Sequence, residues 1–233
     1  MFKILFEDDW FIAAEKPAGL PSQATVDKSR PDFFTQLKKQ LQSARGSDFY
    51  LALHHRLDRD TSGVMIFAKN KEANDPLANM FKKHLIQKTY VAITRNRKMP
   101  ETWEFKNHLA EVRDNKLKKT KMKSVSSGGD MAHTKFRLLE KFKLGMMVEA
   151  QPLTGRMHQI RVHLAEEHMG IFGDDIYPCN KVPVAARLML HALSLEFNHP
   201  FTQQPIKIES ALPEDMKEFI LLLNSEMSAS EKK

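Results

Sequence analysis

The sequence has almost no cysteine and no long apolar run. Cys179 is the only cysteine in 233 residues, so no internal disulfide can form and a cysteine-based zinc site is excluded. No stretch approaches the roughly 20 consecutive apolar residues that a membrane-spanning helix requires. The segment 1–9 meets acidic residues after a very short apolar run, which is typical of neither a signal peptide nor a membrane span. We therefore expect a cytoplasmic protein with no membrane contact.

Internal repeats and long linkers are also missing. A chain of this length can bury one large core or two closely joined lobes. We therefore expect a single domain over residues 1–224, followed by a polar, flexible tail over residues 225–233.

The histidines lack a metal-binding pattern. His158, His163 and His168 recur every five residues, so a helix would not place them on one face as i,i+4 spacing would. We expect no metal site, and no ligand spacing supports a metal-dependent hydrolase.

Short apolar runs rich in β-favouring residues outnumber the segments with helical periodicity. The runs that predict strands are 2–6, 10–14, 51–53, 64–68, 90–94, 102–109, 132–139, 146–150, 188–197 and 206–208. Helical periodicity occurs at 32–43, 72–85 and 213–223. Strands and helices in this irregular order predict an α+β fold. Residues 156–168 also predict a helix, with Ile160 and Leu164 on an apolar face and basic residues on the other.

The charge is basic, with a formal net value of +7. A polyanionic partner is therefore plausible. Five lysines fall within residues 115–123, and the chain then continues into the segment 124–129, which is rich in serine and glycine. This pattern predicts a flexible basic loop, which serves either as a solvated hairpin tip or as a phosphate contact.

The segment from His55 to Gly63 places carboxylate, guanidinium and hydroxyl groups on a turn between two strand-like runs. Asp58 would emerge at a strand end, where rigid neighbours can orient a carboxylate toward a cleft. In the structural alternative, Asp58 pairs with Arg56 or Arg59, and the residues that follow only cap the turn.

The order of residues in this turn, HRLDRDTSG, resembles the signature of the RluA-type pseudouridine synthases. Four further segments resemble motifs of that family and follow in the family's order. They are Lys16–Leu20, Lys88–Ala92, Leu153–His163 with Gly173, Asp174 and Tyr177, and Leu190–Ala192 with Phe197, His199 and Pro200. The chain departs from the family pattern at Met157 and at His168–Gly170. The residues after Thr94 also lack the glycine that is usual there.

The resemblance implies a mixed, mostly antiparallel sheet with flanking helices and an active-site cleft across it. It implies the isomerisation of uridine to pseudouridine in ribosomal or transfer RNA, without a cofactor. Asp58 would be the essential carboxylate, acting by a covalent or a glycal-type route, and Arg161 would favour its ionised form. Tyr90 would stack on the uracil and assist removal of the C5 proton.

The resemblance also suggests substrate-binding residues. Arg56 would fill the gap left by the flipped nucleotide or hold a phosphate, unless it pairs with Asp58 or Asp60. Thr61 would contact the substrate or shape the loop, and Arg156 and Gln159 would contact the substrate or support Arg161. Because Lys16 comes so early, we expect a stand-alone catalytic domain, and a monomer is the simplest assembly. The rival interpretation is an RNA-binding or RNA-folding factor that keeps the fold without turnover.

Overall fold

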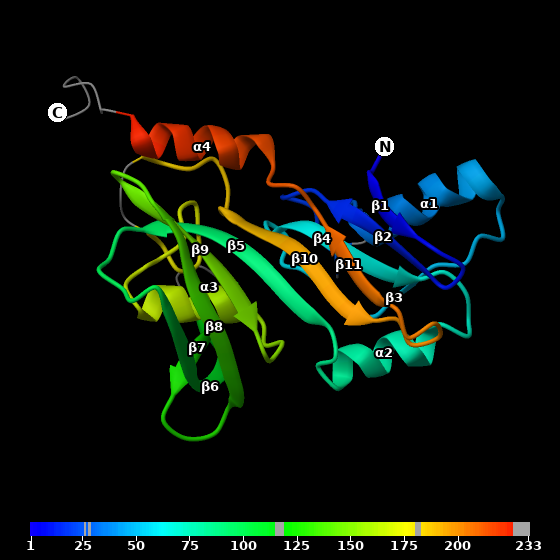
Figure 1. Cartoon of the computed structure of the whole chain (residues 1–233), viewed down its shortest axis with the longest axis horizontal. Helices are drawn as coiled ribbons and strands as arrows, with labels where there is room; N and C mark the ends of the chain where they lie inside the picture. The colour runs from blue at the N-terminus through cyan, green and yellow to red at the C-terminus, as the bar shows by residue number, and fades with distance from the viewer. Residues whose placement is uncertain (26, 28, 115–118, 180–182, 226–233) are drawn as a thin grey trace.

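One mixed sheet runs through the whole molecule (Figure 1). The structure, a computed structural model, describes residues 1–25, 27, 29–114, 119–179 and 183–225. Within them the sheet has eleven strands, and its main path runs β1-β2-β4-β10-β5-β9-β8-β6-β7. The strands are β1 Ile4–Glu7, β2 Phe11–Lys16, β3 Ala52–Leu53, β4 Ser62–Ala68, β5 Gln87–Arg95, β6 Thr102–Asp114, β7 Lys119–Val125, β8 Asp130–Lys141, β9 Gly145–Pro152, β10 Leu190–Asn198 and β11 Pro205–Glu209.

The first half of the sheet, β1 to β4, packs with two helices around one core. All seven residues of β4 are buried, which is what a strand covered on both faces requires. Helix α1, Phe33–Arg45, begins at Asp32, whose carboxylate accepts a hydrogen bond from the amide of Thr35 at 2.9 Å. Helix α1 and helix α2, Asn74–Lys82, bury their apolar faces in this core.

The second half, β5 to β9, forms another core with helices α3, Gln159–Glu166, and α4, Glu214–Asn224. A helix does form within residues 156–168, but the prediction that one of its faces is exposed and basic is wrong. Every residue from Gln159 to Leu164 is buried, including Arg161 and His163. The polar side chains of α3 are hydrogen-bonded inside the protein, so burial does not leave them unpaired.

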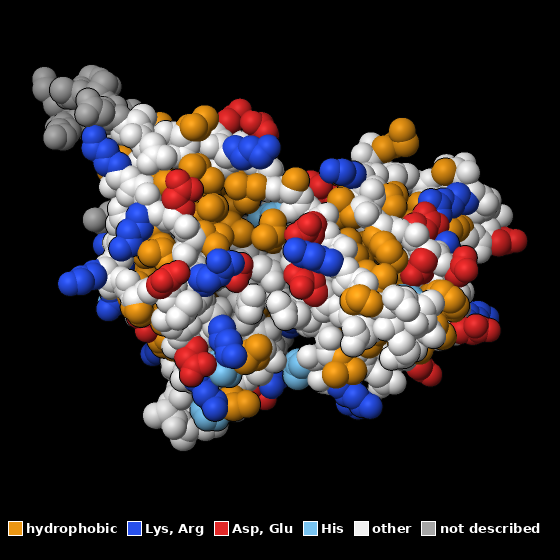
Figure 2. Space-filling model, viewed as in Figure 1, with side chains coloured by type: hydrophobic (Ala, Val, Ile, Leu, Met, Phe, Trp, Pro, Cys, Tyr) orange, Lys and Arg blue, Asp and Glu red, His pale blue; other side chains and the backbone are white. Residues whose placement is uncertain are grey.

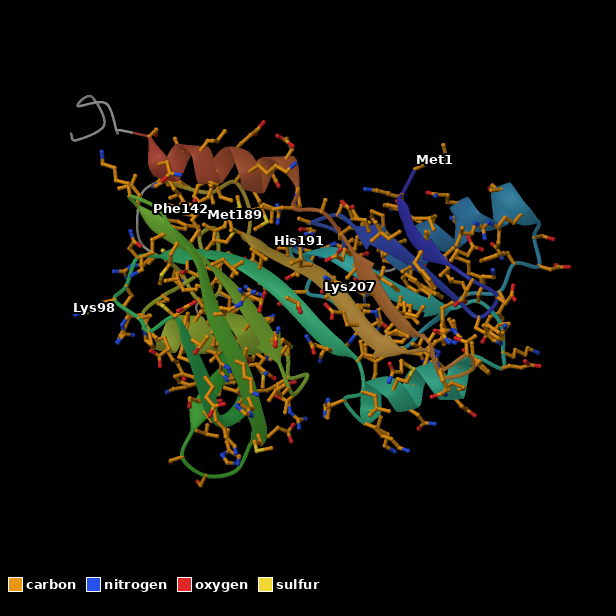
Figure 3. All side chains as sticks on the ribbon, viewed as in Figure 1. Met1, Lys98, Phe142, Met189, His191 and Lys207 are labelled. Atoms are coloured by element: carbon orange, nitrogen blue, oxygen red, sulfur yellow. The ribbon has the colours of Figure 1, made fainter. Side chains whose placement is uncertain are left out.

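Strand β10 joins the two halves. It pairs antiparallel with β5 and parallel with β4, where the register is His191 with Ser62 and Ala192 with Gly63. His191 lies near the centre of the molecule, at this junction (Figure 3). Gly63 has φ 122°, and a Cβ atom there would lie 2.2 Å from the carbonyl oxygen of Ala192. The two strands can therefore meet here only because residue 63 has no side chain.

The expected α+β class and the positions of most elements are confirmed. Strand β7 was not expected, and Lys121 and Lys123 lie on it instead of in a flexible loop. Residues 115–118 of that predicted loop and residues 226–233 of the predicted tail lie outside the described residues. Within the described part of the chain, no helix combines the length and apolar character needed to cross a membrane.

Candidate active site

A cleft of about 1280 Å³ opens between the two halves of the molecule. Its walls come from the 54–61 turn, from α2, from β5 and from the segment that leads into α3. Figure 2 shows the outline of the molecule hollowed between α2 and the β6–β8 region. Acidic and basic side chains are mixed on the face in view, so the basic excess is not gathered there (Figure 2).

The turn that carries Asp58 is held in place by the buried side chain of Lys16. The Lys16 side chain is fully buried, and its Nζ donates to the carbonyl oxygens of Pro17, Leu20 and Arg59 at 2.8, 2.7 and 2.9 Å. Burial lowers the pKa of Lys16 to about 7. The three acceptors match the three N–H groups of an ammonium, so these hydrogen bonds favour the protonated lysine while burial opposes it.

The far end of the turn is held by His191. The Nε2 atom of His191 lies 3.0 Å from the carbonyl oxygen of Ser210, which can only accept, so Nε2 carries the proton. The Ser62 hydroxyl therefore donates to Nδ1, at 2.9 Å. Fixed at both ends, the turn can present Asp58 in one orientation.

Asp58 points away from its own turn. Arg59 pairs with Asp60, at 3.0 Å, and not with Asp58. Among the described residues, two basic side chains lie within 4 Å of the Asp58 carboxylate. They are Arg161, at 3.1 Å, and His158, at 3.9 Å, and the histidine carries a charge only when its ring is protonated. The structural alternative in which Asp58 pairs with Arg56 or Arg59 is therefore not the arrangement present.

Arg161 links Asp58 to a second carboxylate. Its Nε and Nη2 donate to the two oxygens of Asp174, both at 2.8 Å, while Nη1 donates to Asp58. Burial disfavours the guanidinium charge, but the bonds and charges of Asp174 and Asp58 outweigh it and raise the pKa of Arg161. Asp174 is itself buried and also accepts the amides of Ile176 and Tyr177 at 2.9 Å. Asp174 thus holds the Arg161 guanidinium in place beside the Asp58 carboxylate.

Tyr90 lies on β5 in the wall of the cleft and packs against both cores. Burial, followed by the negative charge of Asp58, raises the pKa of Tyr90 far above its ordinary value of 10. The side chain therefore remains a neutral phenol. Lys88, two residues earlier on β5, also lines the cleft, and burial lowers its pKa.

The remaining predicted residues also reach the cleft. Arg56 is exposed there and makes no ion pair within the described residues. Thr61 is buried, and Arg156 donates to Asp130 and to the carbonyl of Met131, both at 3.1 Å. Gln159 is buried and bonded to Thr154, Thr134, the carbonyl of His133 and the amide of Arg156. This geometry favours Gln159 as a support for the loop before α3, and its predicted contact with substrate stays a prediction.

Sequence reasoning did not identify Asp174 and His158 as site residues. Asp174 appeared only as part of a matched motif, and its position directly after Gly173 in that motif was the one sequence feature that pointed to it. His158 also stood in a matched motif, Leu153–His163, but the only role considered for it was that of a metal ligand. In the described part of the chain, no group of three histidine, cysteine, aspartate or glutamate side chains is placed to hold a metal ion.

Comparison with known proteins gives a consistent result. Residues 10–166 match the family model described as RNA pseudouridylate synthase. The chain is 31% identical over 230 residues to ribosomal large subunit pseudouridine synthase C of Vibrio vulnificus (strain CMCP6), covering 95% of this chain and 69% of the relative. It is 32% identical over 231 residues to the protein of that name from Yersinia pestis, covering 94% and 68%.

Solved structures agree with the fold. Human RNA Pseudouridylate Synthase Domain Containing 4 superposes with a TM-score of 0.78 at 25% identity, covering 96% of this chain and 94% of that one. Human RNA Pseudouridylate Synthase Domain Containing 1 gives a TM-score of 0.73 at 22% identity, covering 97% and 96%, and bears on the fold alone.

Proposed function

The chain belongs to the RNA pseudouridylate synthase family, and from this we propose that it converts specific uridines of ribosomal RNA to pseudouridine. Two relatives are named for the large ribosomal subunit, which favours ribosomal RNA over transfer RNA as the substrate. The reaction breaks the bond between N1 of uracil and C1′ of ribose and joins C5 to the same carbon.

The target nucleotide must leave its stack to react, at a cost of a few kcal/mol. The cleft of about 1280 Å³ is large enough to receive a whole nucleotide, and its position between the two halves lets both contribute groups. Arg56 and Arg156, which line it, are suited to bind phosphates next to the flipped base.

Asp58 is the proposed reacting carboxylate. Arg161 holds it at 3.1 Å and places a positive charge beside it, so the carboxylate is oriented before substrate arrives. A carboxylate in this state can attack C1′ of the ribose or remove the proton from C2′. Tyr90, a neutral phenol, would stack on the uracil and offer a hydrogen bond.

The single observation that carries the proposal is the Asp58–Arg161 pair at the floor of the cleft, assembled from residues 103 positions apart. Asp58→Asn keeps the side-chain shape but removes the charge. We expect at least a thousandfold loss of tritium release from ribosomal RNA labelled at uracil C5, in the range that loss of a reacting group produces. RNA binding should be retained.

Asp48→Asn makes the same change of charge at an exposed position outside the cleft and should keep full activity. Full activity in Asp58→Asn would refute the assignment of Asp58. Binding of ribosomal and transfer RNA by the unmodified protein without release from either would favour the rival interpretation, an RNA-binding factor without turnover.

A further inference from the structure

His158 is held with one ring nitrogen turned toward Asp58. Its Nδ1 lies 3.2 Å from the hydroxyl of Tyr177, and its Nε2 lies 3.9 Å from an Asp58 oxygen. The Tyr177 hydroxyl donates to the carbonyl of Met122, at 3.1 Å, and accepts the Met122 amide, at 2.7 Å. Its proton is therefore already engaged, and it can only accept from His158. Nδ1 of the neutral ring carries the proton, which leaves the lone pair of Nε2 facing Asp58.

The backbone of His158 is strained in a way that supports this placement. The residue has φ 53° and ψ 18°, a left-handed conformation that costs a residue other than glycine about 1 kcal/mol or more. The side chain is only 12% exposed and lines the cleft. The local fold thus maintains an unfavourable backbone conformation while the ring stays beside Asp58.

The proposed reaction requires a proton acceptor late in its course. When C5 of uracil has bonded to C1′, it still carries its hydrogen, which must leave to give pseudouridine. Burial and the charge of Asp58 raise the pKa of Tyr90 and keep it a neutral phenol, so its predicted assistance would come from orienting groups, and the proton needs another acceptor. Asp58 can accept it, but must then release it before the next turnover.

We propose that His158 is the proton relay of this site and receives, through its Nε2 atom, the C5 proton that Asp58 removes. This rests on the proposed function. The C5–H bond breaks, and its electron pair forms the C5–C6 double bond. The former C6–N1 π pair moves to N1, which takes a proton from water. The C5 proton passes from Asp58 to Nε2 and then to solvent, so the numbers of protons and charges balance.

The distance of 3.9 Å is longer than a hydrogen bond, and catalytic contacts often tighten only when substrate is bound. The charged groups that face His158 are Asp58 from the turn before β4, Arg161 from α3, and Asp174 and Asp175 from the loop after α3. Burial, opposed by Asp58 and aided by Arg161, lowers the pKa of His158. The ring is therefore neutral near pH 7 and able to accept a proton.

The test is His158→Asn, because asparagine tolerates the left-handed conformation but has no titrating nitrogen. We expect the turnover number on ribosomal RNA to fall about 10- to 100-fold near pH 7.5, while KM and RNA affinity change less than about threefold. The unmodified enzyme should lose activity in acid as His158 is protonated, at a pH below the ordinary histidine value of 6.5 because burial lowers its pKa, and the variant should lack this acidic limb. Imidazole added to the buffer should restore part of the rate.

Tyr177→Phe supplies a second variant, since it removes the acceptor that fixes the tautomer but leaves the ring of His158 in place. It should slow turnover about 3- to 10-fold and keep the acidic limb. Nitrogen NMR of the unmodified protein should show His158 with its proton on Nδ1, a result that depends on neither folding of a variant nor turnover.

The outcomes separate the two proposals. Absence of any tritium release by the unmodified enzyme would overturn the proposed function. Release by the unmodified enzyme, with the same rate and pH profile in His158→Asn, would overturn the relay alone. A slower variant that keeps the acidic limb and gains nothing from imidazole would give His158 a structural role and also overturn it.

Discussion

Arg161 shows how a single residue connects structure and reactivity in this site. Its guanidinium is almost fully buried and contacts Asp174 with two bonds and Asp58 with one. Asp174 is buried too, so this pair is desolvated and each partner depends on the other. Loss of Asp174 would leave a buried cation without its main counter-charge and free to turn away from Asp58.

Asp174→Asn should therefore lower the free energy of unfolding by about 3 kcal/mol, the usual cost of breaking a buried pair from one side. Turnover should fall at least tenfold, because Arg161 no longer holds Asp58 in place. Asp215→Asn is the matched control. Asp215 also receives two bonds from an arginine, Arg187, but its side chain is 49% exposed. The control should lose about 1 kcal/mol or less in urea unfolding, and an equal loss in both variants would contradict the argument.

At the residue scale, sequence motifs predicted Asp58, Tyr90 and Arg161 as neighbours, and the structure places all three at one cleft. Their catalytic roles stay predictions. The partners Asp174 and His158 were not identified, because their importance comes from contacts with residues distant in sequence. A local sequence pattern does not show which buried side chains come into contact in the folded protein.

At the scale of elements, the junction of β4 and β10 determines where Asp58 lies. The two strands share only two register pairs, beside the turn that carries Asp58. Beyond this point β11 takes the same edge of β10, starting from the pair Ser194 with Glu209. The close backbone approach at Gly63 is therefore the link between the first half of the molecule and the rest of the sheet.

Gly63→Ala should separate these strands. A methyl group there meets the backbone of Ala192 at 2.2 to 2.7 Å, and φ 122° is itself unfavourable for alanine. We expect a loss of more than about 3 kcal/mol in unfolding free energy, or no folded protein, by chemical denaturation followed with circular dichroism. Gly46→Ala has a similar φ of 112° but open space around it, so it isolates the conformational cost, about 1 kcal/mol. Similar losses in both variants would show that contact with Ala192 is unimportant.

Elements with clear apolar periodicity were predictable, and those fixed by tertiary contacts were not. β4 was recognised because its run of buried apolar residues matches a covered strand. β7 was missed because its lysines resemble a solvated loop, although pairing with β6 makes it a strand. Helix α3, which is buried from Gln159 to Leu164, looked amphipathic, since its sequence does not show that Gln159, Arg161 and His163 find partners inside.

At the scale of the whole molecule, two large cores and a small third cluster share one sheet. The sequence predicted the α+β class, but not the insertion of β10 between β4 and β5, since strand order depends on pairing between distant segments. The fold also encloses neutral histidines. His163 is fully buried between Thr134 and Asn107, at 2.9 and 3.0 Å, and burial lowers its pKa to about 4.

This burial predicts a loss of global stability in acid. Because the folded pKa of His163 lies below the unfolded value of about 6.5, the unfolded state binds more protons as pH falls from 6.5 to about 4. The contribution of His163 should lower the unfolding free energy by about 2 kcal/mol between pH 7 and pH 5. Urea unfolding at several pH values measures this loss, and His163→Gln should reduce it by that amount. An unchanged pH dependence in the variant would assign the acid sensitivity to other groups.

The pairing of Ser62 with His191 has a consequence for the synthesis of the chain. These residues are 129 positions apart, so Ser62 and Gly63 at the start of β4 leave the ribosome long before the strand that pairs with them. At about 5 to 20 residues per second, the delay is on the order of ten seconds. During this time the start of β4 keeps unpaired backbone groups on this edge, and other chains can join such an edge. Successful biosynthesis therefore depends on keeping this end of β4 protected until β10 has been made.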